Sequence, residues 1–169
     1  MTRWWGCWPG AAGPGDGLLH TVAGRVEEAV AKGAKVLAGR ERVGRCFQAT
    51  LLADVPPDSE LAQLETFGPV AAVEVVDGAE EAVARANDTA YGLAAGILTG
   101  DPDRGLALAD RLQAGIVHVN DQPVGDEPQM PFGGVKDSGW GRFGGQAVVE
   151  EFTELKWVTV QSGTHPFPF

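Results

Sequence analysis

The residues with chemically useful side chains are few in this chain of 169 residues, and Glu65 and Phe67 form the first candidate group. They stand two positions apart, and Gly68-Pro69 fixes the turn that follows them. Such a carboxylate can accept hydrogen bonds from sugar hydroxyls while the ring packs on a planar ligand. The other interpretation is a solvated glutamate beside a core phenylalanine, and these residues alone favour neither.

A second candidate is the glycine-rich stretch of residues 130–145, in which six of the sixteen residues are glycine. Such density indicates positive φ angles or close approach by another group, so a binding loop and a tight connector are both expected. Gly139, Gly141 and Gly144 match the spacing of a dinucleotide-binding loop. That loop directly follows a strand and precedes an acidic residue about 20 positions further on, and neither condition is met here. We therefore rank dinucleotide binding by these glycines last.

Nucleophiles and metal ligands form no recognisable group in the sequence. Cys46 lies in an apolar run and is predicted to be a small core residue, and no base is visibly near Cys7. The three histidines, His20, His118 and His165, do not have the spacing of metal ligands. We predict no metal site, and we assign no catalytic residue.

Composition is typical of a globular protein. The length suits one domain or part of a larger one, and 44% of the residues are apolar, which is enough for a core. The net charge of −10 is dispersed along the chain, which argues against nucleic acid or an anionic membrane as partner. We see no apolar run of membrane-spanning length and no signal-peptide pattern, so we expect a cytoplasmic protein.

Helical and strand patterns alternate through most of the chain. Because most of the predicted strands are apolar on both faces, we predict an α/β fold with an open, mainly parallel sheet and flanking helices. The predicted helices lie near residues 21–33, 59–64, 77–87, 101–112 and 146–152, and the predicted strands near residues 35–38, 46–52, 70–76, 94–99 and 115–120.

Four segments are expected along the chain. Residues 1–20 are an irregular lead-in, residues 21–153 form the α/β domain, residues 154–162 form a strand, and residues 163–169 are a tail. The alternating pattern of residues 156–161 is typical of an edge strand or of a strand that pairs with another subunit.

Several motifs together resemble the C-terminal part of the NAD(P)-dependent aldehyde dehydrogenase superfamily, over about residues 25–161. The segment NDQPVGDEPQMPFGGVKDSGWGRFGG is also similar to the subgroup of benzaldehyde, vanillin and salicylaldehyde dehydrogenases. The most specific motifs are ETFGPV at 65–70, ARANDTAYGLAAGI at 84–97, QAGIVHVND at 113–121 and PFGGVKDSGWGR at 131–142.

The resemblance implies roles for particular residues. In this family a cysteine thiolate adds to the aldehyde, hydride passes to NAD or NADP, and a glutamate-activated water releases the acid. By motif, Glu65 would hydrogen-bond the nicotinamide ribose and Phe67 would pack beside the nicotinamide. Phe132 would line the aldehyde tunnel, and Asn120 with the loop to Gln129 would shape its mouth.

The resemblance also implies that essential groups lie elsewhere. In the family the nucleophilic cysteine, the glutamate base, the oxyanion-hole asparagine and the coenzyme domain precede the point where this match begins. Leu64 and Phe143 stand where many members carry a glutamate. We expect the C-terminal part of an aldehyde dehydrogenase that acts on aromatic aldehydes, inactive by itself and forming homo-oligomers. The alternative is a non-catalytic assembly module that pairs with a full-length dehydrogenase through residues 156–161.

Overall fold

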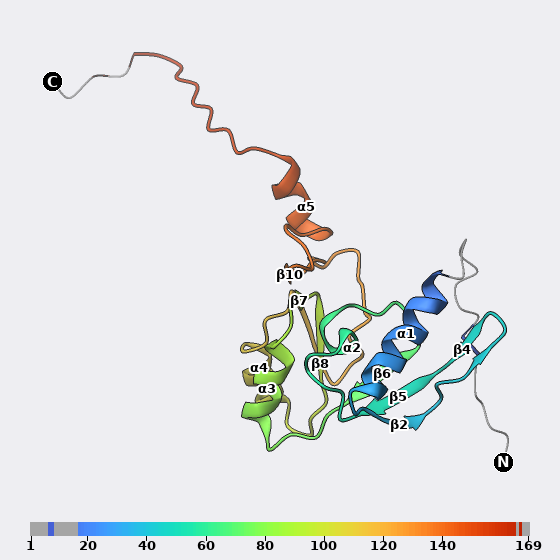
Figure 1. Cartoon of the computed structure of the whole chain (residues 1–169). Helices are drawn as coiled ribbons and strands as arrows, with labels where there is room; N and C mark the ends of the chain where they lie inside the picture. Colours follow the sequence, from blue (N-terminus) through green and yellow to red (C-terminus); the bar gives the residue numbers. More distant parts are fainter. Residues whose placement is uncertain (1–6, 9–16, 165, 167–169) are drawn as a thin grey trace. The chain divides into compact units, whose positions relative to one another are not determined.

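The computed structural model describes residues 7–8, 17–164 and 166 of the chain (Figure 1). Contacts within the chain group it into two compact units, residues 1–84 and residues 85–169. The boundary between the units falls inside helix α3 (Ala79–Asn87). Among the described helices, none is both long enough and apolar enough to cross a lipid bilayer.

Unit 1 combines one long helix with two small sheets (Figure 1). In the first sheet, the central strand β5 pairs in parallel with β6 and antiparallel with β2. The short helix α2 joins β5 to β6, as a parallel pair requires a crossover. The elements are β1 (Cys7–Trp8), α1 (Gly17–Ala31), β2 (Lys35–Ala38), β3 (Arg42–Val43), β4 (Cys46–Gln48), β5 (Thr50–Ala53), α2 (Glu60–Gln63) and β6 (Val70–Val73).

One face of α1 carries the core of unit 1. Val22 and Val26 from the helix cluster with Phe47 of β4 and Leu52 of β5, and each of the four is at most 2% exposed. The spacing of four places the two valines on the same helical face. Because full burial of such a side chain stabilises by about 1.5–3 kcal/mol, this cluster fixes α1 against both sheets.

The turn before β6 also packs against this face of α1. A Cβ atom built on Gly68 would lie 2.6 Å from Val22 Cγ2, well inside ordinary van der Waals contact. Glycine at position 68 is therefore what allows the backbone of the turn to approach the helix.

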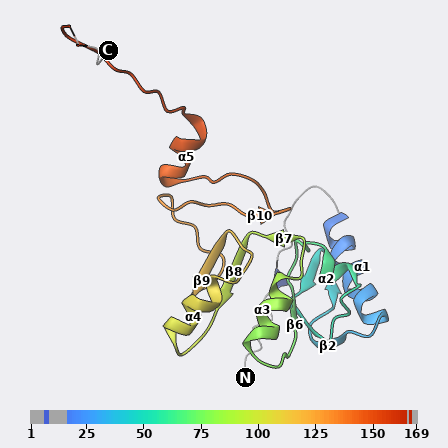
Figure 2. The same ribbon diagram turned by 90° about the vertical axis from the view of Figure 1, so that its left-hand side faces the viewer.

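Unit 2 contains a parallel strand pair with its crossover helix. Figure 2 shows α4 beside β8 and β9, and α4 contacts β9. A second pair, β7 with β10, is antiparallel. The elements that follow α3 are β7 (Tyr91–Gly92), β8 (Ala94–Ile97), α4 (Pro102–Ala109), β9 (Ile116–Val119), β10 (Val135–Lys136) and α5 (Gly145–Phe152).

The predicted α/β fold is confirmed. The two pairs of successive sheet strands that are joined by one helical crossover, β5 with β6 through α2 and β8 with β9 through α4, are parallel, whereas the remaining pairs are antiparallel. At the start of α4, the Asp101 carboxylate caps the helix by accepting hydrogen bonds from the amides of Asp103 and Arg104. Pro102 occupies the first turn of that helix, where no backbone donor is needed.

Several boundaries differ from the predicted ones. The helix expected near Thr21 begins at Gly17, inside the predicted lead-in, and Cys7–Trp8 form a strand. The rest of the lead-in before Gly17 lies outside the described residues. The single strand expected at residues 46–52 is divided at Ala49 into β4 and β5, which belong to different sheets. The division at Ala49 follows from strand pairing, because β4 and β5 pair with different strands.

Ser59 caps α2, because the Ser59 hydroxyl accepts a hydrogen bond from the Ala62 amide at 3.3 Å. Cys46, expected in the core, is only partly buried in β4 and is disulfide-bonded. Residues 156–161 form no strand within this single chain, and all six are exposed.

Charged side chains join the end of α1 to the segment before α2. Lys32 Nζ lies 2.7 Å from Glu28 Oε1 and 3.1 Å from Asp58 Oδ2, and it donates to the Asp58 carbonyl oxygen at 2.6 Å. The hydrogen bonds to Glu28 and Asp58 raise the pKa of Lys32, and the same bond to Lys32 lowers the pKa of Asp58. These groups are at the surface, so salt screens the attraction.

We expect Gly68→Ala to lower the free energy of unfolding by about 1–3 kcal/mol, because the added methyl overpacks the contact with Val22. Gly24→Ala is the matched control: Gly24 lies on the exposed side of α1, and a Cβ there meets nothing within 4 Å. It should instead stabilise the chain by about 0.5–1 kcal/mol. Urea unfolding of both variants measures the difference, and equal effects of the two would contradict the close approach.

We expect Asp58→Asn to destabilise the chain at neutral pH, because the substitution removes the carboxylate whose pKa Lys32 lowers. The greater free energy of unfolding of the wild-type chain is present above the unfolded-state pKa of aspartate. It is lost as the pH falls through the lower folded-state pKa of Asp58. The contribution of Lys32 is present below the ordinary lysine pKa and is lost as the pH rises through its raised folded-state pKa. Urea unfolding over a pH series measures both, and an advantage that persists in acid or in about 1 M salt would be inconsistent with this ion pair.

Candidate functional site

Glu65 and Phe67 lie between α2 and β6 in a turn that we call the ETFGP turn, residues 65–69. Its backbone is joined to β5, because the Thr50 amide donates to the Pro69 carbonyl oxygen at 2.8 Å. Within the turn, the Gly68 amide donates to the Thr66 carbonyl oxygen at 2.7 Å. One side of the turn is therefore held by the sheet.

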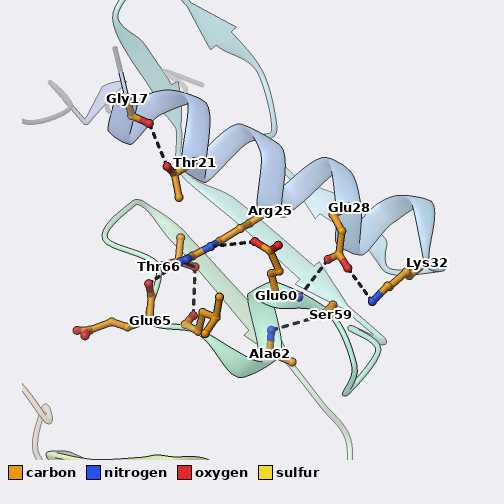
Figure 3. A network of polar contacts seen from close by, with 11 residues as sticks. Gly17, Thr21, Arg25, Glu28, Lys32, Ser59, Glu60, Ala62, Glu65 and Thr66 are labelled. Carbon is orange, nitrogen blue, oxygen red and sulfur yellow. Dashed lines mark hydrogen bonds and ion pairs between the residues drawn. The ribbon is translucent and has the colours of Figure 1, made fainter. Parts of the chain in front are cut away.

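The other side of the ETFGP turn is held by α1. Val22 of the helix packs against Gly68, as described above. Arg25 Nη1 donates to the Glu65 carbonyl oxygen at 2.5 Å and to Thr66 Oγ1 at 3.2 Å (Figure 3). Packing and hydrogen bonding from a single helix thus fix the backbone of the turn.

The side chains that the sequence singled out in this turn face solvent. Phe67 is 68% exposed, so the interpretation of this residue as a core phenylalanine is wrong. Glu65 is exposed, and its carboxylate points away from Arg25 (Figure 3). A fixed backbone that presents a carboxylate and an aromatic ring to solvent is typical of a ligand-binding loop.

Asn120 ends strand β9 in unit 2, with a φ of 61°. Its amide donates to the Ile97 carbonyl oxygen at 2.7 Å, and its side-chain Oδ1 accepts from the Thr99 amide at 2.8 Å. Asparagine tolerates this left-handed backbone conformation better than most residues. The side chain that the resemblance places at the tunnel mouth therefore also joins the ends of β8 and β9.

Phe132 lies in the glycine-rich stretch and is partly buried. It forms an antiparallel bridge with Phe143, in which each residue donates a backbone hydrogen bond of 2.7 Å to the other. Arg142 Nη1 also donates to the Gly134 carbonyl oxygen at 2.8 Å. Backbone pairing therefore closes this stretch into a loop and sets the position of Phe132.

Close backbone approach and positive φ angles account for the glycines of this stretch. A Cβ atom built on Gly144 would lie 2.3 Å from the Met130 carbonyl oxygen, and Gly139, Gly141 and Gly144 have φ angles of 141°, 72° and 82°. The preceding strand, β10, pairs antiparallel with β7, whereas a dinucleotide-binding loop joins a parallel strand to its helix. The structure supports the interpretation of a tight connector.

Other titratable groups add little to the site. Over the described ranges, no three or more His, Cys, Asp or Glu side chains are grouped to hold a metal ion. His118 lies in β9, and its buried Nε2 has no hydrogen-bond partner among the described residues.

The sequence analysis did not single out Arg25, although its position three residues after Val22 places it on the same helical face.

Comparison with known proteins identifies the family to which the sequence is similar. Residues 17–158 match the aldehyde dehydrogenase family. Vanillin dehydrogenase of Pseudomonas fluorescens is 48% identical over 143 residues, which are 85% of this chain and 30% of that protein. Benzaldehyde dehydrogenase (NAD+) of Pseudomonas putida is 48% identical over 145 residues, with the same shares covered. The chain thus spans about a third of the length of these relatives.

Solved structures agree with the sequence matches. A salicylaldehyde dehydrogenase from Pseudomonas putida G7, complexed with salicylaldehyde, is 40% identical with a TM-score of 0.80, and the match covers 90% of this chain and 31% of that one. An aldehyde dehydrogenase of Mycobacterium tuberculosis, complexed with NAD+, is 34% identical with a TM-score of 0.81, covering 90% and 32%. With a family match over residues 17–158 and this agreement in fold, the chain belongs to the aldehyde dehydrogenase family.

Proposed function

We propose that this chain is the C-terminal part of an NAD(P)-dependent dehydrogenase that oxidises aromatic aldehydes to carboxylic acids. The observation that carries the proposal is the ETFGP turn, whose backbone is fixed on two sides while Glu65 and Phe67 face solvent. The names of the relatives support the substrate class, because vanillin, benzaldehyde and salicylaldehyde are all aromatic aldehydes. The catalytic cysteine and the glutamate base belong, in this proposal, to the remaining part of the enzyme.

The exposed groups of the turn fit a nicotinamide nucleotide. The Glu65 carboxylate is a hydrogen-bond acceptor suited to ribose hydroxyls, and the Phe67 ring offers a flat apolar face for the nicotinamide. When bound, NAD or NADP supplies the acceptor for hydride. Solved relatives are complexed with NAD+ and with NADP, so the proposal includes both coenzymes. The contribution of the turn is to hold and orient the ribose.

In unit 2, Phe132 and Asn120 are the proposed contributors to the aldehyde passage. Phe132 is held by its backbone bridge to Phe143, and Asn120 by its bonds to Ile97 and Thr99. Both positions are therefore determined by the backbone of unit 2. An aromatic ring at position 132 suits a flat aromatic substrate.

A graft tests this proposal. Residues 17–161 replace the corresponding segment of the salicylaldehyde dehydrogenase from Pseudomonas putida G7, which supplies the rest of the enzyme. We expect NADH formation with salicylaldehyde and benzaldehyde. Glu65→Gln should raise the KM for NAD by about tenfold or more, because a hydrogen bond to a charged group contributes about 1.5–3 kcal/mol. Glu27→Gln, at an exposed position of α1, is the matched control and should leave this KM unchanged.

Three outcomes would count against the proposal. An active graft whose KM for NAD and kcat respond to neither Glu65→Gln nor Phe67→Ala would contradict the coenzyme role. A graft that oxidises aliphatic but not aromatic aldehydes would contradict the substrate class. The 169-residue chain assayed alone should form no NADH from benzaldehyde, so NADH formation would show that it needs no other segment.

A second proposal concerns assembly, and it is favoured by the C-terminal segment, residues 154–162. We propose that this segment pairs with another subunit, either a second copy or a full-length aldehyde dehydrogenase. Leu155, Trp157 and Val160 are 106%, 91% and 90% exposed. Several exposed apolar side chains within one short segment are typical of an interaction surface.

Replacing both Trp157 and Val160 with serine in the graft should lower its molar mass in solution, because the paired surface is lost. Val124→Ser is the matched control, since Val124 is 85% exposed in unit 2 but lies outside this segment. Light scattering coupled to size-exclusion chromatography measures the mass. An unchanged oligomer would contradict pairing through residues 154–162, whereas an inactive chain that co-purifies with a full-length dehydrogenase would favour the assembly module.

A further inference from the structure

We infer that Arg25 is a positioning residue, which fixes the part of the ETFGP turn that carries Glu65 and Phe67. The inference rests on the proposed function for the coenzyme role of these two side chains. The fixing of the turn itself rests on contacts within unit 1 (Figure 3).

The guanidinium of Arg25 is largely buried and faces the turn. The Arg25 side chain is 15% exposed, and its Nη1 reaches both the Glu65 carbonyl oxygen and Thr66 Oγ1. Its Nε lies 3.6 Å from Glu60 Oε2, too far for a hydrogen bond. Glu60 is 62% exposed, so this ion pair is weak, and the two bonds to the turn hold the guanidinium.

The acceptors that Arg25 uses leave the functional group of Glu65 available. The guanidinium binds the backbone carbonyl of Glu65, while the carboxylate points away from it (Figure 3). The peptide unit that follows Glu65 is thereby fixed without neutralising the carboxylate. The two N–H groups of Nη1 are fixed in the plane of the guanidinium, which orients one toward each acceptor, whereas the ammonium of lysine rotates freely.

The other anchors of the turn act further along the chain. Val22 packs on Gly68, and the Thr50 amide binds the Pro69 carbonyl, so both act after Phe67. Among the described residues, the hydrogen bonds that reach Glu65 and Thr66 from outside residues 64–70 come from Arg25. Loss of this guanidinium therefore releases the first half of the turn and leaves the second half anchored.

Amide hydrogen exchange in the full 169-residue chain tests the fixing of the turn. In Arg25→Met, exchange at the Gly68 amide, which binds the Thr66 carbonyl, should accelerate by about tenfold, as expected for the loss of one hydrogen bond. The Ala34 amide, which is bound to the Ala29 carbonyl and lies outside the turn, is the reference for opening of the whole unit. Its exchange rate should stay at the wild-type value. Arg25→Lys should recover part of the protection.

Lys32→Met is the matched control, because Lys32, directly after α1, is also a cation that binds a backbone carbonyl, that of Asp58, but it does not touch the turn. Equal Gly68 exchange in Arg25→Met and Lys32→Met would overturn the inference. Thr66→Val provides a second variant that removes one acceptor without altering α1. It should accelerate Gly68 exchange less than Arg25→Met, and no acceleration in either variant would also overturn the inference.

Kinetics of the graft test the link to the coenzyme. Arg25→Met should raise the KM for NAD and leave the KM for the aldehyde unchanged, with partial rescue by Arg25→Lys. General destabilisation would instead lower the amount of active enzyme at unchanged KM values, and that result would overturn the positioning role. If Gly68 exchange changes but the KM for NAD responds to neither Arg25→Met nor Glu65→Gln, the proposed coenzyme function fails while the anchoring of the turn by Arg25 stands.

Discussion

When Val22 and Val26 bury against Phe47 and Leu52, α1 is fixed in both position and rotation on the strands of unit 1. Rotation matters because the helix also carries the polar side chains that reach the neighbouring segment. With the two valines inward, Arg25 meets the ETFGP turn, and Glu28 accepts a hydrogen bond from the first residue of α2, Glu60. One apolar contact surface therefore determines where the ETFGP turn and α2 are placed.

The sequence predicted most of the regular elements because their causes are local. Apolar side chains at helical spacing mark α1, for example. The division of residues 46–52 at Ala49 was not predictable in this way, because each half pairs with a different strand. The local sequence pattern shows which residues are apolar, but it does not show which strand a given segment will pair with.

The site was predicted only in part, for a related reason. The identity of Glu65 and Phe67 indicated their chemistry, but whether Phe67 lies in the core or in solvent depends on the fold of the whole unit. Arg25 acts across 40 positions of sequence on Glu65, and no spacing rule connects residues so far apart. The family resemblance implied roles for residues within its motifs, whereas the contact of Arg25 with the turn follows only from the folded structure.

Arg25 binds a backbone atom at position 65 but a side-chain atom at position 66, so the two positions tolerate different substitutions. At position 65 the anchor is a main-chain oxygen, which every amino acid possesses, so the side chain there can change while the backbone stays in place. At position 66 the anchor is a hydroxyl, which restricts that position to side chains that carry one. The side chain at position 65 can therefore be replaced, in evolution or by engineering, without loss of the contact that holds the backbone of the turn.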